Sequence, residues 1–185
     1  IRSTQISVDS KIQMIDLLLR YGYDLNDKRY ADQVMPLEDA CSTGSSQIVQ
    51  HLLFKGASVI RAPNAIFKAV RSSKILSILM PYKPDVNISK KNKLISEKKN
   101  YDPHLMKGIP YHYTAKSGAT PLHIAAANCD IIAISMLLDA GADIRLLDSA
   151  DRTPWEILKC QIDYFYKHSL LTEESKMCFR KMKRL

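Results

Sequence analysis

The chain has 185 residues, of which 46% are apolar, 27 are Lys or Arg, 19 are Asp or Glu and four are Cys, giving a formal net charge of +8. This balance excludes a disordered chain, a collagen-like chain and a small disulfide scaffold. No apolar run reaches the roughly 20 residues that a membrane-spanning helix needs, so we expect a soluble intracellular protein, cytoplasmic or nuclear, with reduced thiols.

Residues 1–33 contain one clear helical signal. Leu17-Leu18-Leu19 is followed by Gly22, a residue type that readily takes the left-handed conformation ending a helix, and then by Asp24-Leu25-Asn26. The residues before about position 10 carry no comparable pattern. We interpret this segment as the back half of a structural unit whose front half, near Ile1 to Ser10, is degenerate.

Residues 34–61 and 62–87 repeat that order of features. The first segment runs from Met35-Pro36-Leu37-Glu38 through Ala40, Gly44, Ile48-Val49 and Leu52-Leu53 to Gly56-Ala57-Ser58. The second is a poorer copy, because it fits only with two residues deleted between its helices and with Lys83-Pro84 in place of Gly-Ala. Each segment predicts two short helices joined by a turn and followed by a loop.

Residues 118–150 carry the clearest copy, and residues 151–168 begin another. The clear copy runs from Thr120-Pro121-Leu122-His123 through Ala125-Ala126 and Met136-Leu137-Leu138 to Gly141-Ala142-Asp143. Thr153-Pro154-Trp155-Glu156 then restarts the pattern, 33 positions after Thr120 (153 − 120). Thr120 can cap a helix whose first turn holds Pro121, where the missing N–H costs nothing.

The period and these two sequence elements together resemble the ankyrin repeat. The resemblance implies an all-α solenoid of stacked helix-turn-helix units with projecting loops. It implies that His123 is a hydrogen-bonded structural residue tying adjacent loops, and helical core spacing predicts that Trp155 lies in the core of the last repeat. The expected organisation is one domain over residues 1–185, with repeats at about 1–33, 34–61, 62–87, 118–150 and 151–168, an insertion at 88–117 and a C-terminal capping helix at 172–184.

The insertion separates the third and fourth predicted repeats. In the repeat frame the next Thr should stand at position 95, but it stands at 120, which leaves about 25 extra residues. Residues 88–100 are rich in Lys, whereas residues 101–114 gather Tyr, His and Met side chains of the kind found at contact surfaces. Two interpretations stay open: this cluster contacts a partner, or it covers the irregular third repeat.

Candidate catalytic and metal-binding patterns are weak. The chain has no glycine-rich phosphate loop, no G-x-S-x-G element and no carboxylate cluster. The spacing of Cys160, His168 and Cys178 matches no common zinc pattern, and His104 with His112 is only a pair. Cys41 and Cys129 stand where the resemblance implies core and turn positions. The sequence therefore predicts no enzyme, no cofactor and no metal.

The leading hypothesis is a scaffold that binds another protein through its concave face and loop tips, aided by the insertion. The predicted contact residues share positions in projecting loops, on first helices or in the insertion. They are Lys28, Arg29, Tyr30, Asp32, Ser42, Arg71, Tyr101, His104, Met106, Tyr111, His112, Tyr113, Asn128, Arg145, Leu147, Asp148 and Asp151.

Two rival hypotheses follow from charge and from the start of the chain. Residues 88–117 carry a net charge of +5 and residues 167–185 carry +4, so the chain could bind nucleic acid or anionic lipid through these basic segments. Because the chain begins with Ile1 rather than Met, it could also be the docking domain of a larger enzyme or effector. The abundance of Ile, Lys, Asn and Tyr suits an AT-rich genome, such as that of an intracellular bacterium or a large DNA virus, whose ankyrin proteins act on host partners.

Overall fold

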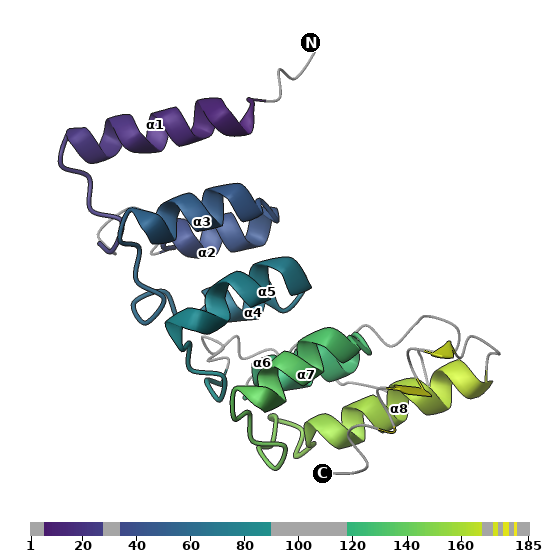
Figure 1. Ribbon diagram of the computed structural model, residues 1–185. Coiled ribbons are helices and arrows are strands. Elements are labelled where there is room, and N and C mark those ends of the chain that lie inside the picture. The colour runs from purple at the N-terminus through teal and green to yellow at the C-terminus, as the bar shows by residue number, and fades with distance from the viewer. Residues whose placement is uncertain are drawn as a thin grey trace, which may run out of the picture. The chain divides into compact units, whose positions relative to one another are not determined.

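The computed structural model describes residues 6–27, 34–89 and 118–167, together with residues 172, 173, 176, 177 and 180. Within these residues the secondary structure is entirely helical, and Figure 1 shows the helices in chain order. They are α1 (Val8–Arg20), α2 (Pro36–Thr43), α3 (Ser46–Phe54), α4 (Ala65–Ala69), α5 (Ser73–Leu79), the 3₁₀ turn η1 (Met80–Tyr82), α6 (Pro121–Ala127), α7 (Ile131–Asp139) and α8 (Pro154–Lys167). Contacts divide the chain into two compact units, Ile1–Asp85 and Val86–Leu185.

The first unit is built from paired helices. α2 packs against α3 and α4 packs against α5, and the pairs stack with α2 on α4 and α3 on α5. α1 lies against α3. The core between the pairs is fully buried, since Val49, Ala65 and Leu76 expose none of their surface. Short helices of this kind are stabilised mainly by the packing of their apolar faces, because isolated helices of such length are marginal in water.

Residues with a left-handed backbone conformation follow the second helix at equivalent positions of the repeats. Gly22, Gly56 and Gly141 follow the second helix of their repeats with φ of 84°, 95° and 87°. The irregular third repeat keeps this conformation with Lys83, whose φ is 50°. Lys83 therefore does take the place of the glycine that the repeat pattern expects there, at a cost that glycine would not carry.

The second unit packs α6 against both α7 and α8. Leu122, Ala126 and Ile134 are fully buried, and Leu158 brings α8 into the same core. The expectation that Trp155 lies in this core is wrong: Trp155 is half-buried, because the buried face of α8 is formed by Pro154, Ile157, Leu158 and Gln161, one turn apart, and Trp155 lies beside it.

Several predicted features fall outside the described residues. They are residues 90–117 of the insertion predicted at 88–117, the loop at 28–33 and most of the capping helix predicted at 172–184. Within the described part of the chain, no helix is long and apolar enough to cross a membrane.

Candidate functional site

Two asparagines connect the loop that ends one repeat to the loop that ends the next. In the first unit, Asn26 donates from Nδ2 to the carbonyl of Gly56 at 3.0 Å, and its Oδ1 accepts from the N–H of Ser58 at 2.7 Å. In the second unit, Asn87 makes the same pair of bonds with the carbonyl of Gly141 at 3.1 Å and the N–H of Asp143 at 2.8 Å. One amide side chain thus satisfies a donor and an acceptor of the neighbouring loop.

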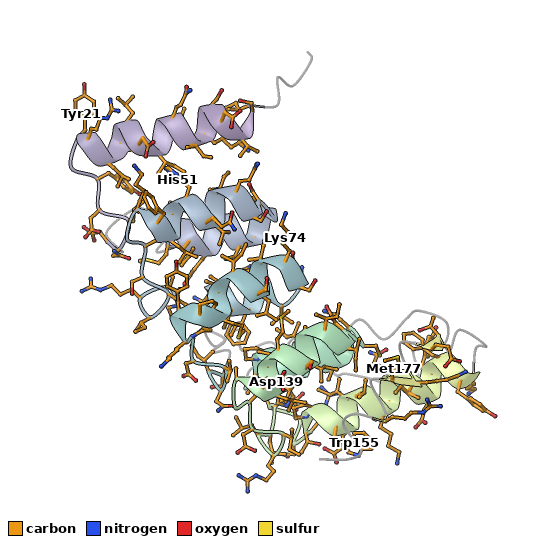
Figure 2. The ribbon with its side chains drawn as sticks, in the orientation of Figure 1. Tyr21, His51, Lys74, Asp139, Trp155 and Met177 are labelled. Atoms are coloured by element: carbon orange, nitrogen blue, oxygen red, sulfur yellow. The ribbon has the colours of Figure 1, made fainter. Side chains whose placement is uncertain are left out.

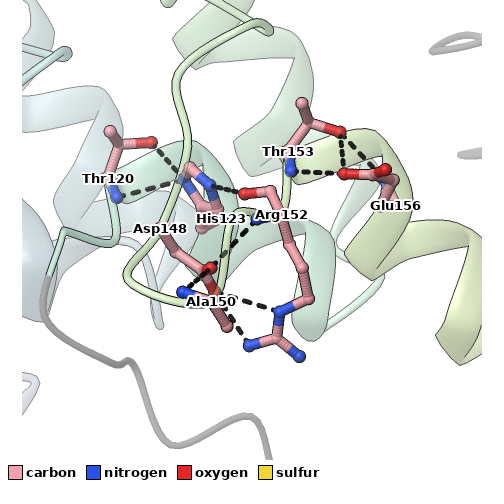
Figure 3. Close-up of polar contacts among 7 residues, drawn as sticks. All are labelled: Thr120, His123, Asp148, Ala150, Arg152, Thr153 and Glu156. Atoms are coloured by element: carbon pink, nitrogen blue, oxygen red, sulfur yellow. Dashed lines mark hydrogen bonds and ion pairs between the residues drawn. The ribbon is translucent and has the colours of Figure 1, made fainter.

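His123 links the start of α6 to the loop that precedes α8 (Figure 3). Its Nδ1 accepts from the backbone N–H of Thr120 at 3.1 Å and lies 2.8 Å from the Thr120 hydroxyl, while Nε2 lies 2.9 Å from the carbonyl of Arg152. These partners suit a neutral ring with its hydrogen on Nε2. Burial lowers the pKa of His123, because it disfavours the charged imidazolium. This arrangement agrees with the structural role that the resemblance implied.

Asp148 organises the loop before α8 and is a correction to the predicted contact residues. Its Oδ1 accepts from the N–H groups of Ala150 and Arg152, and its Oδ2 pairs with the Arg152 guanidinium at 2.8 Å (Figure 3). Burial by itself disfavours the carboxylate, but these bonds hold the pKa of Asp148 below its ordinary value. Asp148 is only 3% exposed, so its side chain supports the loop from inside and is not available to a partner.

Glutamates take the place of His123 in two other repeats, with different results. Buried Glu38 accepts from the N–H of Asn64 at 3.1 Å and so joins α2 to the start of α4. Glu156 accepts from the N–H of Thr153 at 2.7 Å, while its own N–H bonds to the Thr153 hydroxyl, which forms a capping box at the start of α8 (Figure 3). The first carboxylate connects two repeats, whereas the second stabilises its own helix.

A cluster of polar side chains joins α1 to α3. Asp16 Oδ1 lies 2.9 Å from both His51 Nε2 and Lys55 Nζ, and Figure 2 shows His51 on the side of α3 that faces α1. The hydrogen bonds from Lys55 and His51 hold the pKa of Asp16 below its ordinary value. None of the residues in α1 is buried, so this cluster is a specific anchor for a helix that contributes little to the core.

The remaining predicted contact residues fall into two groups. Those in the described part lie on the surface: Ser42 and Arg71 in the first unit, and Asn128, Arg145, Leu147 and Asp151 in the second. Arg145 is oriented by Asp143, whose carboxylate accepts from its Nε at 3.0 Å and from its Nη2 at 3.2 Å. The other predicted contacts lie outside the described residues: Lys28, Arg29, Tyr30, Asp32, Tyr101, His104, Met106, Tyr111, His112 and Tyr113.

Comparison with known proteins identifies the architecture. A family model described as ankyrin repeats, in three copies, matches residues 37–148. The chain belongs to the ankyrin repeat family. It is 28% identical over 166 residues to a fowlpox virus protein named as an ankyrin repeat protein, an alignment that covers 80% of this chain and 87% of the viral protein.

Two plant proteins named as E3 ubiquitin-protein ligases also match these ankyrin repeats. The protein from Oryza sativa subsp. japonica is 30% identical over 146 residues, and the one from Arabidopsis thaliana is 28% identical over 159 residues. The alignments cover 71% and 79% of this chain but only 29% and 30% of the plant proteins. The likeness therefore concerns a minor part of each ligase.

Burial disfavours the thiolate form of two cysteines in the ankyrin repeats. Burial, with a smaller contribution from the charge of Glu38, raises the pKa of the Cys41 thiol to about 12. Burial also raises the pKa of Cys129 to about 11. A thiol that stays protonated is a poor nucleophile. Among the described residues, no group of three or more His, Cys, Asp or Glu side chains could hold a metal ion.

Sequence reasoning missed the polar residues that join the ankyrin repeats. Asn26 and Asn87 stand at the same place in D-hydrophobic-N elements of the first and third repeats, which is a signal that was visible in the sequence. Asp16 had no such signal, because its partners His51 and Lys55 lie 35 and 39 positions away and belong to another helix.

Proposed function

We propose that this chain is a non-catalytic module that holds a partner protein through the loop tips and exposed first-helix sides of its ankyrin repeats. Ankyrin repeats in general are protein-interaction modules. The observation that carries the proposal is the structure of the loop before α8. An ion pair between Asp148 and Arg152 holds this loop in place, while Leu147 in the same loop is 52% exposed. A loop already held in place loses little conformational entropy when a partner binds.

The contact surface that we propose combines an apolar residue with charges. In the second unit, Leu147 lies between Arg145 and Asp151 in sequence, and all three are exposed. In the first unit, Ser42 and Arg71 are the exposed first-helix contributions. An apolar centre with charged neighbours is the usual composition of a specific protein interface.

The insertion is the second part of the proposed contact surface. Its composition is the support, since residues 101–114 include Tyr101, Met106, Tyr111 and Tyr113 together with two His. Such side chains are enriched among interface residues that carry binding energy. The similarity to a fowlpox virus ankyrin protein supports a further proposal, that the partner is a host-cell protein.

A pull-down with mass spectrometry from eukaryotic cell lysate tests the loop surface. The test variant combines Arg145→Glu with Leu147→Ser. The matched control combines Lys159→Glu with Ile132→Ser, because Ile132 is also 52% exposed but lies on the second helix α7. We expect the test variant to lose a partner that the control retains at high salt. Equal retention by both variants would contradict a role for this loop.

The same pull-down tests the insertion with a chain in which residues 90–114 are replaced by a short Gly-Ser turn. Loss of the partner with unchanged helical circular dichroism supports a contact role, whereas loss of helical signal supports the covering role. Recovery of nucleic acid or lipid alone, released by added salt, would overturn the module proposal in favour of polyanion binding.

A further inference from the structure

Positive charge in the first unit is concentrated in the third repeat. Residues 59–84 contain five Lys or Arg and no Asp or Glu. The described residues that precede them, 6–27 and 34–58, contain three Lys or Arg against six Asp or Glu, a net charge of −3 (3 − 6). The five cations are all exposed, and they are Arg61, Lys68, Arg71, Lys74 and Lys83. A basic repeat therefore adjoins two acidic ones.

Three of these cations lie along the first helix of the third repeat. Lys68 belongs to α4, and Arg71 follows it three positions later, a spacing that places two residues on the same side of a helix. This side is the exposed one, because Phe67 and Ala69 on either side of Lys68 are buried. Arg61 belongs to the loop that leads into α4 and is also exposed. We refer to Arg61, Lys68 and Arg71 as the basic band.

The charges of the basic band are not balanced within the described part of the chain. None of its three side chains forms an ion pair or a hydrogen bond with another described residue. By contrast, Lys55, Arg145 and Arg152 each pair with an aspartate. The insertion does not supply the missing negative charge, since residues 88–117 carry a net charge of +5. The basic band is therefore complementary to a partner that carries negative charge.

The surroundings of the basic band favour a short acidic protein segment over a nucleic acid or a lipid surface. Asp39 is exposed at the position of α2 that corresponds to Lys68, since each precedes a buried alanine, and α2 packs directly on α4. A nucleic acid or a membrane presents negative charge over a larger area and would also meet this carboxylate. Ile60, next to Arg61, is 81% exposed and offers the apolar contact that protein interfaces use.

We infer that the basic band binds an acidic segment of a partner protein, with an apolar residue of that segment against Ile60. The inference rests on the proposed function, because it uses the exposed sides of first helices, but it uses neither the loop before α8 nor the insertion. The unpaired cations select a negatively charged segment and accelerate its association. Asp39 on the adjoining repeat limits the length of the acidic stretch, because like charges repel.

Selection of short random peptides, displayed on phage, against the 185-residue chain tests the inference. We expect the selected peptides to be rich in Asp and Glu and to carry an apolar residue. Combining Lys68→Glu with Arg71→Glu should weaken their binding about tenfold or more. The matched control combines Lys11→Glu with Lys159→Glu, which changes the net charge equally at exposed positions outside the basic band, and it should bind normally. Selection of no peptides, selection without acidic enrichment, or equal losses in the two variants would overturn the inference.

Charge exchange tests the pairing itself. A selected peptide whose Asp and Glu are replaced by Lys should bind the variant that combines Lys68→Glu with Arg71→Glu more tightly than it binds the original chain, because opposite charges then meet again. Circular dichroism and thermal unfolding establish that each variant is folded. A folded variant that does not prefer the exchanged peptide would contradict the charge pairing.

Two comparisons separate this inference from its rivals. The variant that combines Arg145→Glu with Leu147→Ser should bind the acidic peptides unchanged, which would support the inference even if the loop before α8 contacts no partner. Peptides that are lost by this loop variant but kept by the variant of the basic band would support the loop surface and overturn the inference. Tighter binding of single-stranded DNA or of phosphatidylserine vesicles through Lys68 and Arg71 would overturn it in favour of polyanion binding.

Discussion

Lys83 is a site of backbone strain in the irregular third repeat. Its φ of 50° and ψ of 59° lie in the left-handed region, which costs a residue with a Cβ roughly 1–2 kcal/mol. The side chain is exposed, so its removal should lose little packing. The strain is therefore local and can be relieved.

We predict that Lys83→Gly raises the free energy of unfolding by about 0.5–1 kcal/mol, after the entropic cost that glycine adds in the unfolded chain. Urea unfolding followed by circular dichroism measures the change. Lys83→Ala is the control, because it removes the same charge but keeps the Cβ. A gain of equal size in the Ala variant would show that charge, and not backbone strain, limits stability here.

His123 makes the stability of the second unit dependent on pH. The pKa of the folded imidazole lies below the ordinary value of about 6.5, so at acidic pH the unfolded chain takes up a proton that the folded chain resists. The contribution of neutral His123 to the free energy of unfolding is complete above the pKa that His123 has in the unfolded chain, and it is lost as the pH falls below that value. The free energy of unfolding should decrease between about pH 7.5 and pH 5. His123→Gln should show a shallower decrease, and equal slopes in both proteins would contradict the assignment.

At the scale of elements, the repeats are joined by side chains of a few loop residues as well as by helix packing. Asn87 makes two hydrogen bonds to the loop after α7, and net contributions of about 1 kcal/mol per bond are typical. We predict that Asn87→Ala lowers the free energy of unfolding by about 1–2 kcal/mol. Asn128→Ala is the control, since Asn128 is exposed at the end of α6. A similar loss in the control would show that the loop bridge is unimportant.

α1 should be the least stable helix of the first unit, because none of its residues is buried. We predict that its amide hydrogens exchange faster than those of α2 to α5, and that Asp16→Ala accelerates exchange in α1 alone. The pKa of folded Asp16 is lowered, so its contribution is present above the ordinary carboxyl pKa of about 4 and is lost as the pH falls below it. Uniform exchange across the first unit would contradict a weakly held α1.

At the scale of the whole molecule, the sequence separations spanned by the two asparagine bridges give the length of the insertion. The bridge from Asn26 to Gly56 spans 30 positions, whereas the equivalent bridge from Asn87 to Gly141 spans 54, a difference of 24. At the downstream end, a Cβ on Gly118 would lie 3.1 Å from the backbone nitrogen of Ser149, so Gly118 lies close to the backbone of the loop before α8. Deleting the segment 91–114, which has the length of this difference, should restore the ordinary spacing.

We predict that this deletion leaves helical circular dichroism and the thermal midpoint unchanged within a few degrees. Differential scanning calorimetry measures the midpoint. Gly118→Ala is a contrasting variant, because its φ of 82° and the contact with Ser149 should make it destabilising by about 1–3 kcal/mol. A deletion that destabilises more than Gly118→Ala would favour the covering role of the insertion.

The sequence determined the repeat architecture and much of its residue chemistry. The repeat period is visible in the sequence, as are Thr120-Pro121 at a helix start and the positions of the glycines. These features follow from local backbone preferences, which depend on neighbouring residues. His123 was assigned its structural role by the same pattern. The place of Lys83 in the glycine position was also visible, because the interval to Asn87 is kept.

Tertiary structure decided which polar residues face inward and which helix faces stay open. Asp148 stands between exposed neighbours in the sequence, yet it is buried because Arg152 and two backbone N–H groups turn it into the loop. Trp155 lies outside the core because α8 packs on α6 through the face that contains Pro154, Ile157 and Leu158, and Trp155 lies beside that face. The contact of α8 with α6 joins residues remote in the chain, so no local pattern specifies which face of α8 is buried.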